Sequence, residues 1–216
     1  MHNYLIAKVT GEMAKFVDLQ FYLDFSFATG KYHPYEMDAN IANSYSQTMQ
    51  FVVNSLYDNP HSVLKAISSA EKTILIQSDC FLPDNAFMQT LKIAAQSGVE
   101  IKIMFSNSVT NKIKYYSSRG IAKELANFNI NFYLYDGIMN SNAIVIDDET
   151  FILNSADIEY TDMNFGFQNS LFIYDEQICK EVRQKFIENM NNCFVISKNC
   201  KLSNKEKFYR AIYPIV

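Results

Sequence analysis

Three histidines are the side chains of this sequence best suited to acid–base or nucleophilic chemistry at neutral pH. His2 is at the N-terminus, His33 precedes a proline in a loop, and His61 stands in front of a helix. None belongs to an H-x-K pair or to another pattern that would make it a nucleophile or a general base. Each histidine is therefore interpreted as a surface or capping residue.

Carboxylates and thiols are the next candidates, since both can bind metal ions. The run Asp147-Asp148-Glu149 is typical of a solvated hairpin turn, and no further ligands follow it at a suitable spacing. The four cysteines lack the paired C-x-x-C spacing of a zinc site and are too sparse for a disulfide scaffold: Cys80, Cys179, Cys193 and Cys200. The sequence predicts neither a metal site nor another cofactor.

A third group of polar residues lies close to the ends of expected strands. Ser155 and Asp157 could line a polar pocket there, and Gln168 could reach into it. Alternatively, these side chains bond neighbouring backbone groups, as polar residues of turns and loops commonly do. The sequence leaves both interpretations open.

The elements that must position these residues alternate between strands and helices. Apolar runs and period-two patterns predict strands at 4–9, 49–56, 73–76, 100–105, 131–135, 143–146, 151–153 and 170–174. Helical spacing predicts helices at 11–29, 62–71, after Pro83-Asp84, at 112–128 and around 178–190. This order favours an α/β fold with a mixed, mostly parallel β-sheet flanked by helices on both faces, in which 73–76, 101–104 and 144–146 are central strands.

A chain of 216 residues suits one domain, 1–216, with a connecting loop at 30–48 and a C-terminal tail at 198–216. Residues 205–216 mix basic and aromatic side chains, a composition that fits either a membrane surface or docking on a partner.

Composition narrows the class of protein. Hydrophobic residues make up 49% and charged residues 19%, which indicates a packed globular core. The net charge of -4 lacks the basic excess of a nucleic-acid binder. No run of 18 apolar residues and no secretory signal is visible, so we expect a cytoplasmic protein. Any contact with a membrane is expected to be peripheral, at the inner membrane face.

Three ordered blocks resemble the second half of a bacterial cardiolipin synthase of the phospholipase D superfamily. Residues 19–30 are similar to the segment that joins the two halves of that family. Phe81-Leu82-Pro83-Asp84 with 98–104 resembles the signature YFxPDxxxxxxLxxAAxxGVxVxIM. The stretches 144–149 and 171–175 resemble the strands around the catalytic loop. Three blocks in the right order and spacing are far more specific than one isolated motif.

The sequence differs from that family at the residues of the catalytic motif. Its catalytic loop reads H-x-K-x4-D, and here these positions are Asn140, Asn142 and Asp147, so that only the aspartate is kept. The family run G-S-A-N-x-D corresponds to 154–159, with Ser155 and Asp157 inside it, and a later family Glu falls at Gln168.

The resemblance implies phosphatidyl transfer through a phosphohistidine, which needs an imidazole that attacks phosphorus and a second one that protonates the leaving alkoxide. An asparagine amide can do neither, and Asn142 carries no charge to stabilise phosphate oxygens. The resemblance therefore implies a chain that is inactive alone, with Asn140, Asn142, Asp147, Ser155, Asp157 and Gln168 as its vestigial motif and pocket.

Three roles follow. The chain is a degenerate half retained as the partner of an intact phospholipid enzyme or as a binder of phospholipid or phosphate. Alternatively, a second chain with an intact loop completes an active phosphatidyltransferase. The third role, a dimeric phosphodiesterase of the nuclease branch, would place the same asparagines in both of its loops. We expect the partner, a second copy or another phospholipase D-like chain, on the face that carries Asn140 and the strand 170–174.

Overall fold

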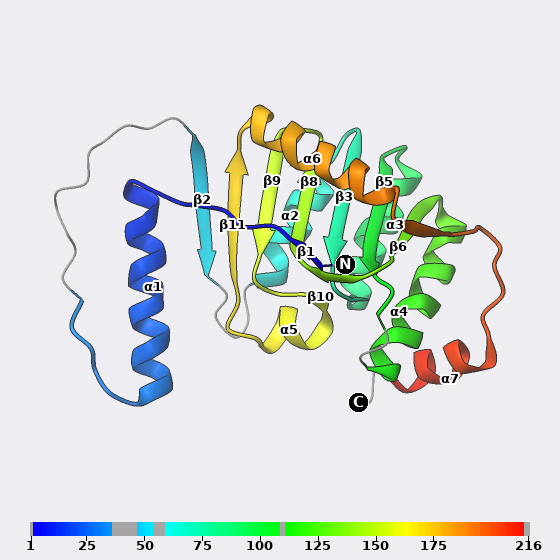
Figure 1. Ribbon diagram of the computed structural model, residues 1–216, viewed down its shortest axis with the longest axis horizontal. Coiled ribbons are helices and arrows are strands. Elements are labelled where there is room, and N and C mark those ends of the chain that lie inside the picture. Colours follow the sequence, from blue (N-terminus) through cyan, green and yellow to red (C-terminus); the bar gives the residue numbers. More distant parts are fainter. Residues whose placement is uncertain (1, 36–46, 54–58, 109–110, 214–216) are drawn as a thin grey trace.

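The computed structural model describes residues 2–35, 47–53, 59–108 and 111–213, which form a large mixed sheet between helices (Figure 1). The eight strands of this sheet lie in the order β12-β6-β5-β3-β8-β9-β11-β2. Their bounds are β2 (Thr48–Val53), β3 (Thr73–Ser78), β5 (Glu100–Ser106), β6 (Ile130–Tyr135), β8 (Asn142–Ile146), β9 (Thr150–Asn154), β11 (Asn169–Tyr174) and β12 (Cys193–Ile196). The expected central strands β3, β5 and β8 are confirmed as neighbours near the middle of the sheet.

The expected α/β class with a mixed sheet is confirmed, but the expected majority of parallel pairings is wrong. Only the pairings β3–β5 and β5–β6 are parallel, while the other five pairings of this sheet are antiparallel. The connections explain the difference. The parallel strands are joined by helical crossovers, whereas β8 and β9 are joined by the short turn 147–149, which is too short for a parallel return.

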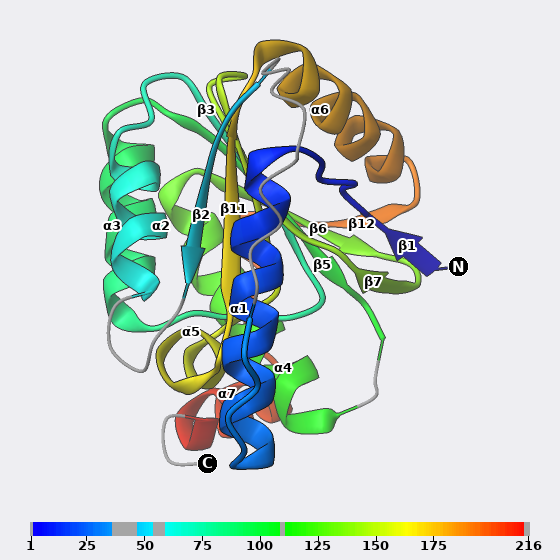
Figure 2. The same cartoon turned by 90° about the vertical axis from the view of Figure 1, so that its left-hand side faces the viewer.

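Helices cover both faces of the sheet, as expected. One face packs against α2 (Asn59–Ser68), α3 (Asn85–Gln96) and α4 (Lys112–Leu125), and its core includes Ile76, Ile103 and Phe132. The opposite face packs against α6 (Glu176–Met190) around Phe186. Figure 2 shows α2 and α3 on one side of the sheet and α6 on the other.

Local sequence signals begin and end these helices where expected. The Asp84 carboxylate accepts a hydrogen bond from the Phe87 backbone N–H at 2.7 Å and caps the start of α3. Gly98 follows α3 with φ 97°, a backbone angle that residues with a side chain rarely adopt, which explains why a glycine stands at the end of this helix.

Two pairs of short strands bring distant segments to one end of the sheet. β1 (His2–Tyr4) pairs with β7 (Ile138–Asn140), and β4 (Phe81–Leu82) pairs with β10 (Ile158–Glu159). The expected strand at 4–9 is wrong, because pairing stops at Tyr4 and the next residues run as irregular chain. Parts of the expected loop 30–48 and strand 49–56 lie outside the described residues.

The C-terminal segment forms α7 (Asn204–Ile212) and docks on its own chain. Tyr209 stacks on Tyr116 of α4 with ring centroids 5.3 Å apart. The Tyr213 hydroxyl donates to the backbone oxygen of Leu82 at 3.2 Å. The segment that we expected on a membrane surface or on a partner is therefore packed on α4 of its own chain.

The strand β11, which we expected at a partner face, lies inside the sheet. It pairs with β9 on one side and with β2 on the other. Ser170, Leu171, Phe172 and Ile173 are all buried. The prediction that this strand faces an open seam is therefore wrong, because β2 occupies the edge that the sequence left free.

Candidate functional site

The site lies at the end of the sheet where β3 leads into β4 and β7 leads into β8. Asn142 begins β8, and its side-chain oxygen accepts a hydrogen bond from the Ser78 hydroxyl at 2.9 Å. The Asn142 side chain also bonds the carboxylate of Asp157. Asn142 is therefore engaged by its own chain on two sides.

Asn140 does not join this arrangement. It is the last residue of β7, its side chain is exposed, and its backbone stands beside Tyr4 of β1. Ser141, between the two asparagines, is buried and accepts a hydrogen bond from the Gln77 amide at 2.7 Å. The two motif positions thus differ: Asn142 is bonded within a polar cluster, whereas the Asn140 side chain is exposed.

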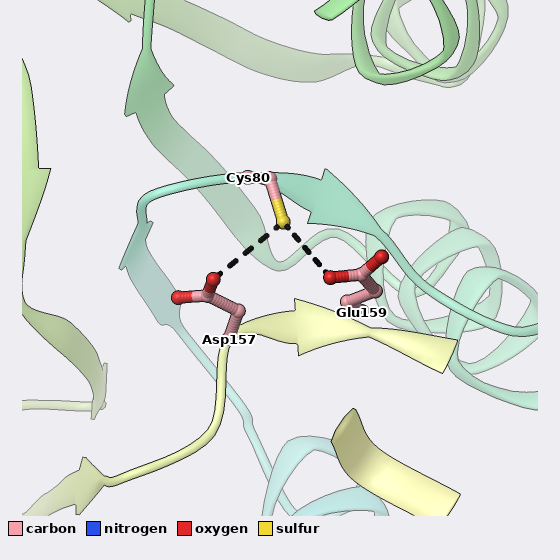
Figure 3. A group of neighbouring side chains, drawn as sticks. All are labelled: Cys80, Asp157 and Glu159. Atoms are coloured by element: carbon pink, nitrogen blue, oxygen red, sulfur yellow. Dashed lines mark hydrogen bonds between the residues drawn. The ribbon is translucent and has the colours of Figure 1, made fainter. Parts of the chain in front are cut away.

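The polar cluster consists of Ser78, Cys80, Lys114, Asn142, Asp157 and Glu159. Figure 3 shows the Cys80 thiol between the carboxylates of Asp157 and Glu159, with its sulfur 3.8 Å from an oxygen of each. The ammonium group of Lys114, from α4, donates to Glu159 Oε2 at 2.5 Å. Four separate stretches of the chain therefore meet here: 78–80, 114, 142 and 157–159.

The burial of this cluster changes its acid–base properties. Burial raises the pKa of Asp157, the bond from Asn142 lowers it in part, and nearby Asp79 raises it further. Burial likewise raises the pKa of Asp79. Burial and these carboxylates raise the pKa of the Cys80 thiol far above its ordinary value, so it stays protonated at neutral pH and is a poor nucleophile.

Lys114 is held in its charged form. Its partial burial alone would lower its pKa, but the hydrogen bond to Glu159 and the nearby acidic groups outweigh that effect and raise it. Three carboxyl groups, those of Asp79, Asp157 and Glu159, therefore surround one ammonium group. When all four groups are ionised, the three carboxylates and the one ammonium group leave an excess of two negative charges.

Three of these side chains, Cys80, Asp157 and Glu159, have potential metal-ligand atoms within 4.8 Å of one another. The positive charge beside Glu159 is supplied by the Lys114 ammonium, and both carboxylates receive hydrogen bonds from the chain. A metal ion at this position would have to displace Lys114 from Glu159. The arrangement is therefore better explained as an internal ion pair.

Little space remains in the cluster. The cavity beside Asp79, Cys80, Ser106 and Lys114 has a volume of about 30 Å³, and the one beside Asp157 and Ile158 has about 10 Å³. The larger of the two has room for about one water molecule. In this conformation neither cavity can admit a phosphodiester.

Asp147 lies at the opposite end of β8 from Asn142. Its carboxylate accepts three backbone N–H bonds, from Glu71, Lys72 and Thr73, at 2.7, 2.8 and 2.7 Å. Asp147 thus fixes the turn before β3 and does not line the polar cluster. The hairpin turn expected around it is confirmed.

We expect Asp147→Asn to lower the free energy of unfolding by about 2 kcal/mol. The substitution replaces one of the two carboxylate oxygens that accept backbone N–H bonds by an NH2 group, which can only donate. Asparagine tolerates the left-handed backbone at this position, where φ is 54°. Urea denaturation of this variant and of the exposed control Glu149→Gln measures the effect. Equal stabilities would show that the three bonds contribute little.

Ser155 and Gln168 are hydrogen-bonded to each other. The Ser155 hydroxyl donates to the Gln168 side-chain oxygen at 2.6 Å and accepts from the Asn169 backbone N–H at 2.9 Å. Ser155 is exposed and makes none of the bonds that join the cluster described above. In the structure these two side chains satisfy local polar groups near the start of β11.

We expect Asp157→Asn to become more stable relative to the parent as the pH rises. Because folding raises the pKa of Asp157 above its ordinary 3.8, ionisation of this carboxyl disfavours the folded state as the pH rises through that range. The asparagine variant has no carboxyl to ionise at this position. Its free energy of unfolding should therefore exceed that of the parent by more at pH 7 than at pH 3, and this difference should be on the order of 1 kcal/mol. Denaturation at both pH values, with exposed Asp136→Asn as control, measures it. A gain that is the same at both pH values would contradict the assignment.

Sequence reasoning missed Cys80 and Lys114 as members of the site. Glu159 could have been found, because it stands at the final acidic position of the run 154–159. No sequence pattern could have linked Lys114 to the site, because it lies on a separate helix, 45 residues from Glu159. The spacing of the cysteines predicts buried or idle thiols, and Cys80 is buried, but the sequence does not show that it contacts both carboxylates.

Comparison with known proteins identifies the family. Residues 63–190 match the family model "Cardiolipin synthase, PLD-like domain", where PLD stands for phospholipase D, so the chain belongs to this family. A cardiolipin synthase of Staphylococcus aureus is 37% identical over 131 residues, which are 60% of this chain and 26% of that protein. Cardiolipin synthase 1 of Staphylococcus epidermidis is 28% identical over 97% of this chain and 46% of its own length. The chain thus spans about a quarter to a half of the curated relatives it matches.

Solved structures show the same fold. Nuc, a phospholipase D family member from Salmonella typhimurium, superimposes with a TM-score of 0.63 at 18% identity and covers 71% of this chain and all of its own. Phosphatidylserine synthase of Haemophilus influenzae superimposes with a TM-score of 0.61 at 11% identity, over 92% of this chain and 52% of its own. The fold is therefore phospholipase D-like, and the sequence resemblance to cardiolipin synthase is confirmed.

Proposed function

We propose that this chain is a catalytically inactive phospholipase D-like domain that acts as the partner of an intact phospholipid enzyme. The observation that carries the proposal is the state of the motif. Asn142 stands where the family has a charged lysine, and its amide bonds Ser78 and Asp157 instead of facing an open pocket. No imidazole belongs to the polar cluster, so no phosphohistidine can form there.

A role in binding lipid phosphate is less well supported than a partner role. Phosphate sites concentrate positive charge and N–H donors around the anion. Here, the acidic groups Asp79, Asp157 and Glu159 outnumber the single ammonium group of Lys114, and the cavity beside it has only about 30 Å³. A phosphate group entering this cluster would meet net repulsion.

A second candidate function is a subunit of an active phosphatidyltransferase. It is favoured by one fact, that the chain corresponds to less than half of each of the two cardiolipin synthases described above. In this case a second chain with an intact H-x-K-x4-D loop completes a shared site. This chain would then contribute residues around Asn142 to cardiolipin synthesis.

Mixing this protein with an intact cardiolipin synthase in lipid vesicles tests both functions. A partner role predicts co-purification, with no change in turnover when Asn142 is replaced by alanine. A shared site predicts that Asn142→Ala lowers the turnover of the mixture without weakening the complex. Failure to co-purify with any phospholipase D-like chain would contradict both functions.

We place the protein in the cytoplasm, with peripheral access to the inner membrane face through its partner. Within the described residues, no helix combines the length and the hydropathy needed to cross a bilayer. The basic residues of α7 are directed in part to their own chain, since Arg210 pairs with Glu124 at 3.5 Å. Vesicle co-sedimentation with and without the partner measures this access.

A further inference from the structure

A groove lies between helix α4 and the strands β6 and β12, away from the polar cluster. It has a volume of about 450 Å³, and small-molecule sites usually have about 300–1,000 Å³. Figure 1 shows α4 and β6 at the opposite end of the sheet from helix α1 (Glu12–Thr29). All members of the polar cluster lie outside the lining of this groove, so it is a separate candidate for a binding site.

One wall of the groove is apolar. Leu134 of β6 and Phe194 of β12 are opposite each other in the antiparallel register, so their side chains lie on the same face of the sheet. Ile196 follows Phe194 by two residues and therefore shares that face. Leu134 and Ile196 are buried in the core that α4 covers, whereas Phe194 is 57% exposed. The groove thus offers apolar surface that a ligand can reach from solvent.

The facing wall is positively charged. Arg119 and Lys123 are four residues apart on α4, which places both on the same side of the helix, and both line the groove. Their side chains are only 24% and 10% exposed, so water screens these charges less than it screens charges at the surface. The described residues that line the groove include no carboxylate.

The two cations are held in place but are not neutralised. Arg119 Nε and Lys123 Nζ donate to the same carboxylate, that of Glu206, at 3.4 and 2.8 Å, so two positive charges share one negative charge. Arg119 Nη1 also donates to Asn107 Oδ1 at 3.2 Å, which fixes the guanidinium from a second side. Within the described part of the chain, Arg119 Nη2 hydrogen-bonds no other group. One positive charge and two N–H donors therefore remain for a ligand.

We propose that this groove binds a small soluble organic monoanion with a hydrocarbon body, of which a carboxylate on a short alkyl chain is the simplest example. The carboxylate lies against Arg119 and Lys123, and the chain lies against Leu134 and Phe194. A guanidinium fork matches the two oxygens of a carboxylate, and the excess of one positive charge suits a single negative charge. This site is independent of the proposed partner function, which its failure would leave untouched.

Cys200 provides a local reporter of occupancy, because its exposed thiol lines the groove. Burial raises the pKa of the other three thiols, those of Cys80, Cys179 and Cys193, so N-ethylmaleimide should modify Cys200 first at neutral pH. Peptide mass spectrometry measures the rate of this modification in the whole protein. We expect saturating hexanoate to slow it at least about fivefold, since thiol reactivity depends on access.

Two substitutions remove different parts of the proposed site. Phe194→Asp places a negative charge on the apolar wall and should raise the hexanoate concentration for half-protection at least about tenfold. Arg119→Gln removes the guanidinium and should have an effect of about the same size. This variant keeps the pair between Lys123 and Glu206, and circular dichroism checks that it is folded. Phe194→Asp tests the site even if Arg119→Gln does not fold, because Phe194 is exposed and belongs to no ion pair.

Phe16→Asp is the matched control. Phe16 is 56% exposed, almost the same as Phe194, and it lies on α1 at the other end of the sheet (Figure 1). Its half-protection by hexanoate should equal that of the parent. Each variant is compared with its own rate of Cys200 modification without ligand, so that a change in the intrinsic reactivity of the thiol cancels.

Two simpler molecules separate the chemistry of the ligand. At the concentration of hexanoate that protects, 1-hexanol has the chain without the charge, acetate has the charge without the chain, and both should protect weakly. Equal protection by either one would overturn the proposal, since the groove would then be merely apolar or would hold any small anion. Absence of protection by hexanoate, or protection that survives Phe194→Asp, would also overturn it. Protection by phosphatidylglycerol vesicles but not by hexanoate would assign the groove to a lipid surface instead.

Discussion

We expect the purified protein to form no cardiolipin from phosphatidylglycerol and to hydrolyse no phosphodiester above the buffer background. The reaction needs an imidazole to attack phosphorus, and the polar cluster offers only amide, carboxyl, hydroxyl, ammonium and protonated thiol groups. Removing the nucleophile from a well-studied hydrolase lowers turnover by about a millionfold. Mass spectrometry of the lipid products, with an intact synthase assayed in parallel, measures this result.

Restoring the motif with Asn140→His/Asn142→Lys should leave both rates at background. Asn140 is exposed, so an imidazole introduced at that position would stand in solvent. A lysine at 142 would also lose the bond to Ser78. Finally, the chain would still lack the second histidine of the reaction. Turnover by the parent that survives Asn142→Ala would show that an active site lies elsewhere in the protein.

Glu206→Ala should cause the largest loss of stability, about 3 kcal/mol, because it leaves two partly buried cations without their counter-ion. Glu206 is 3% exposed, and its carboxylate accepts from Lys123 Nζ at 2.8 Å and from Arg119 Nε at 3.4 Å. It also completes a capping box with Ser203 at the start of α7. The substitution therefore weakens both the helix and its docking on α4.

Urea denaturation measures this loss, and Glu188→Ala is the control. Glu188 pairs with Lys185 at the same 2.8 Å, but both side chains are about half exposed or more, so its removal should cost much less stability than that of Glu206. Burial alone would raise the pKa of Glu206, but its bonds to Lys123 and Ser203 outweigh this and lower it. The stability that Glu206 contributes is therefore present above the unfolded pKa of about 4.5 and should disappear as the pH falls through the lower folded value. Equal losses in both variants would contradict the role of burial.

The sequence by itself determined most of the helices and sheet strands, the family and the loss of the catalytic motif. Apolar periodicity and capping residues act over a few positions, so the positions of β3, α3 and α6 could be predicted from neighbouring residues alone. The replacement of two motif residues by Asn140 and Asn142 was equally visible, because it needs only the order of residues along the chain.

Only the tertiary structure decided which side chains meet. The contact between Lys114 and Glu159 joins residues 45 positions apart, and the one between Cys80 and Glu159 joins residues 79 positions apart. Such contacts depend on strand order and on which strand takes the sheet edge, and a local pattern carries no information about either. For the same reason, the sequence could not show that β2 would enclose β11, or that α1 would stand at the edge with its apolar side chains uncovered.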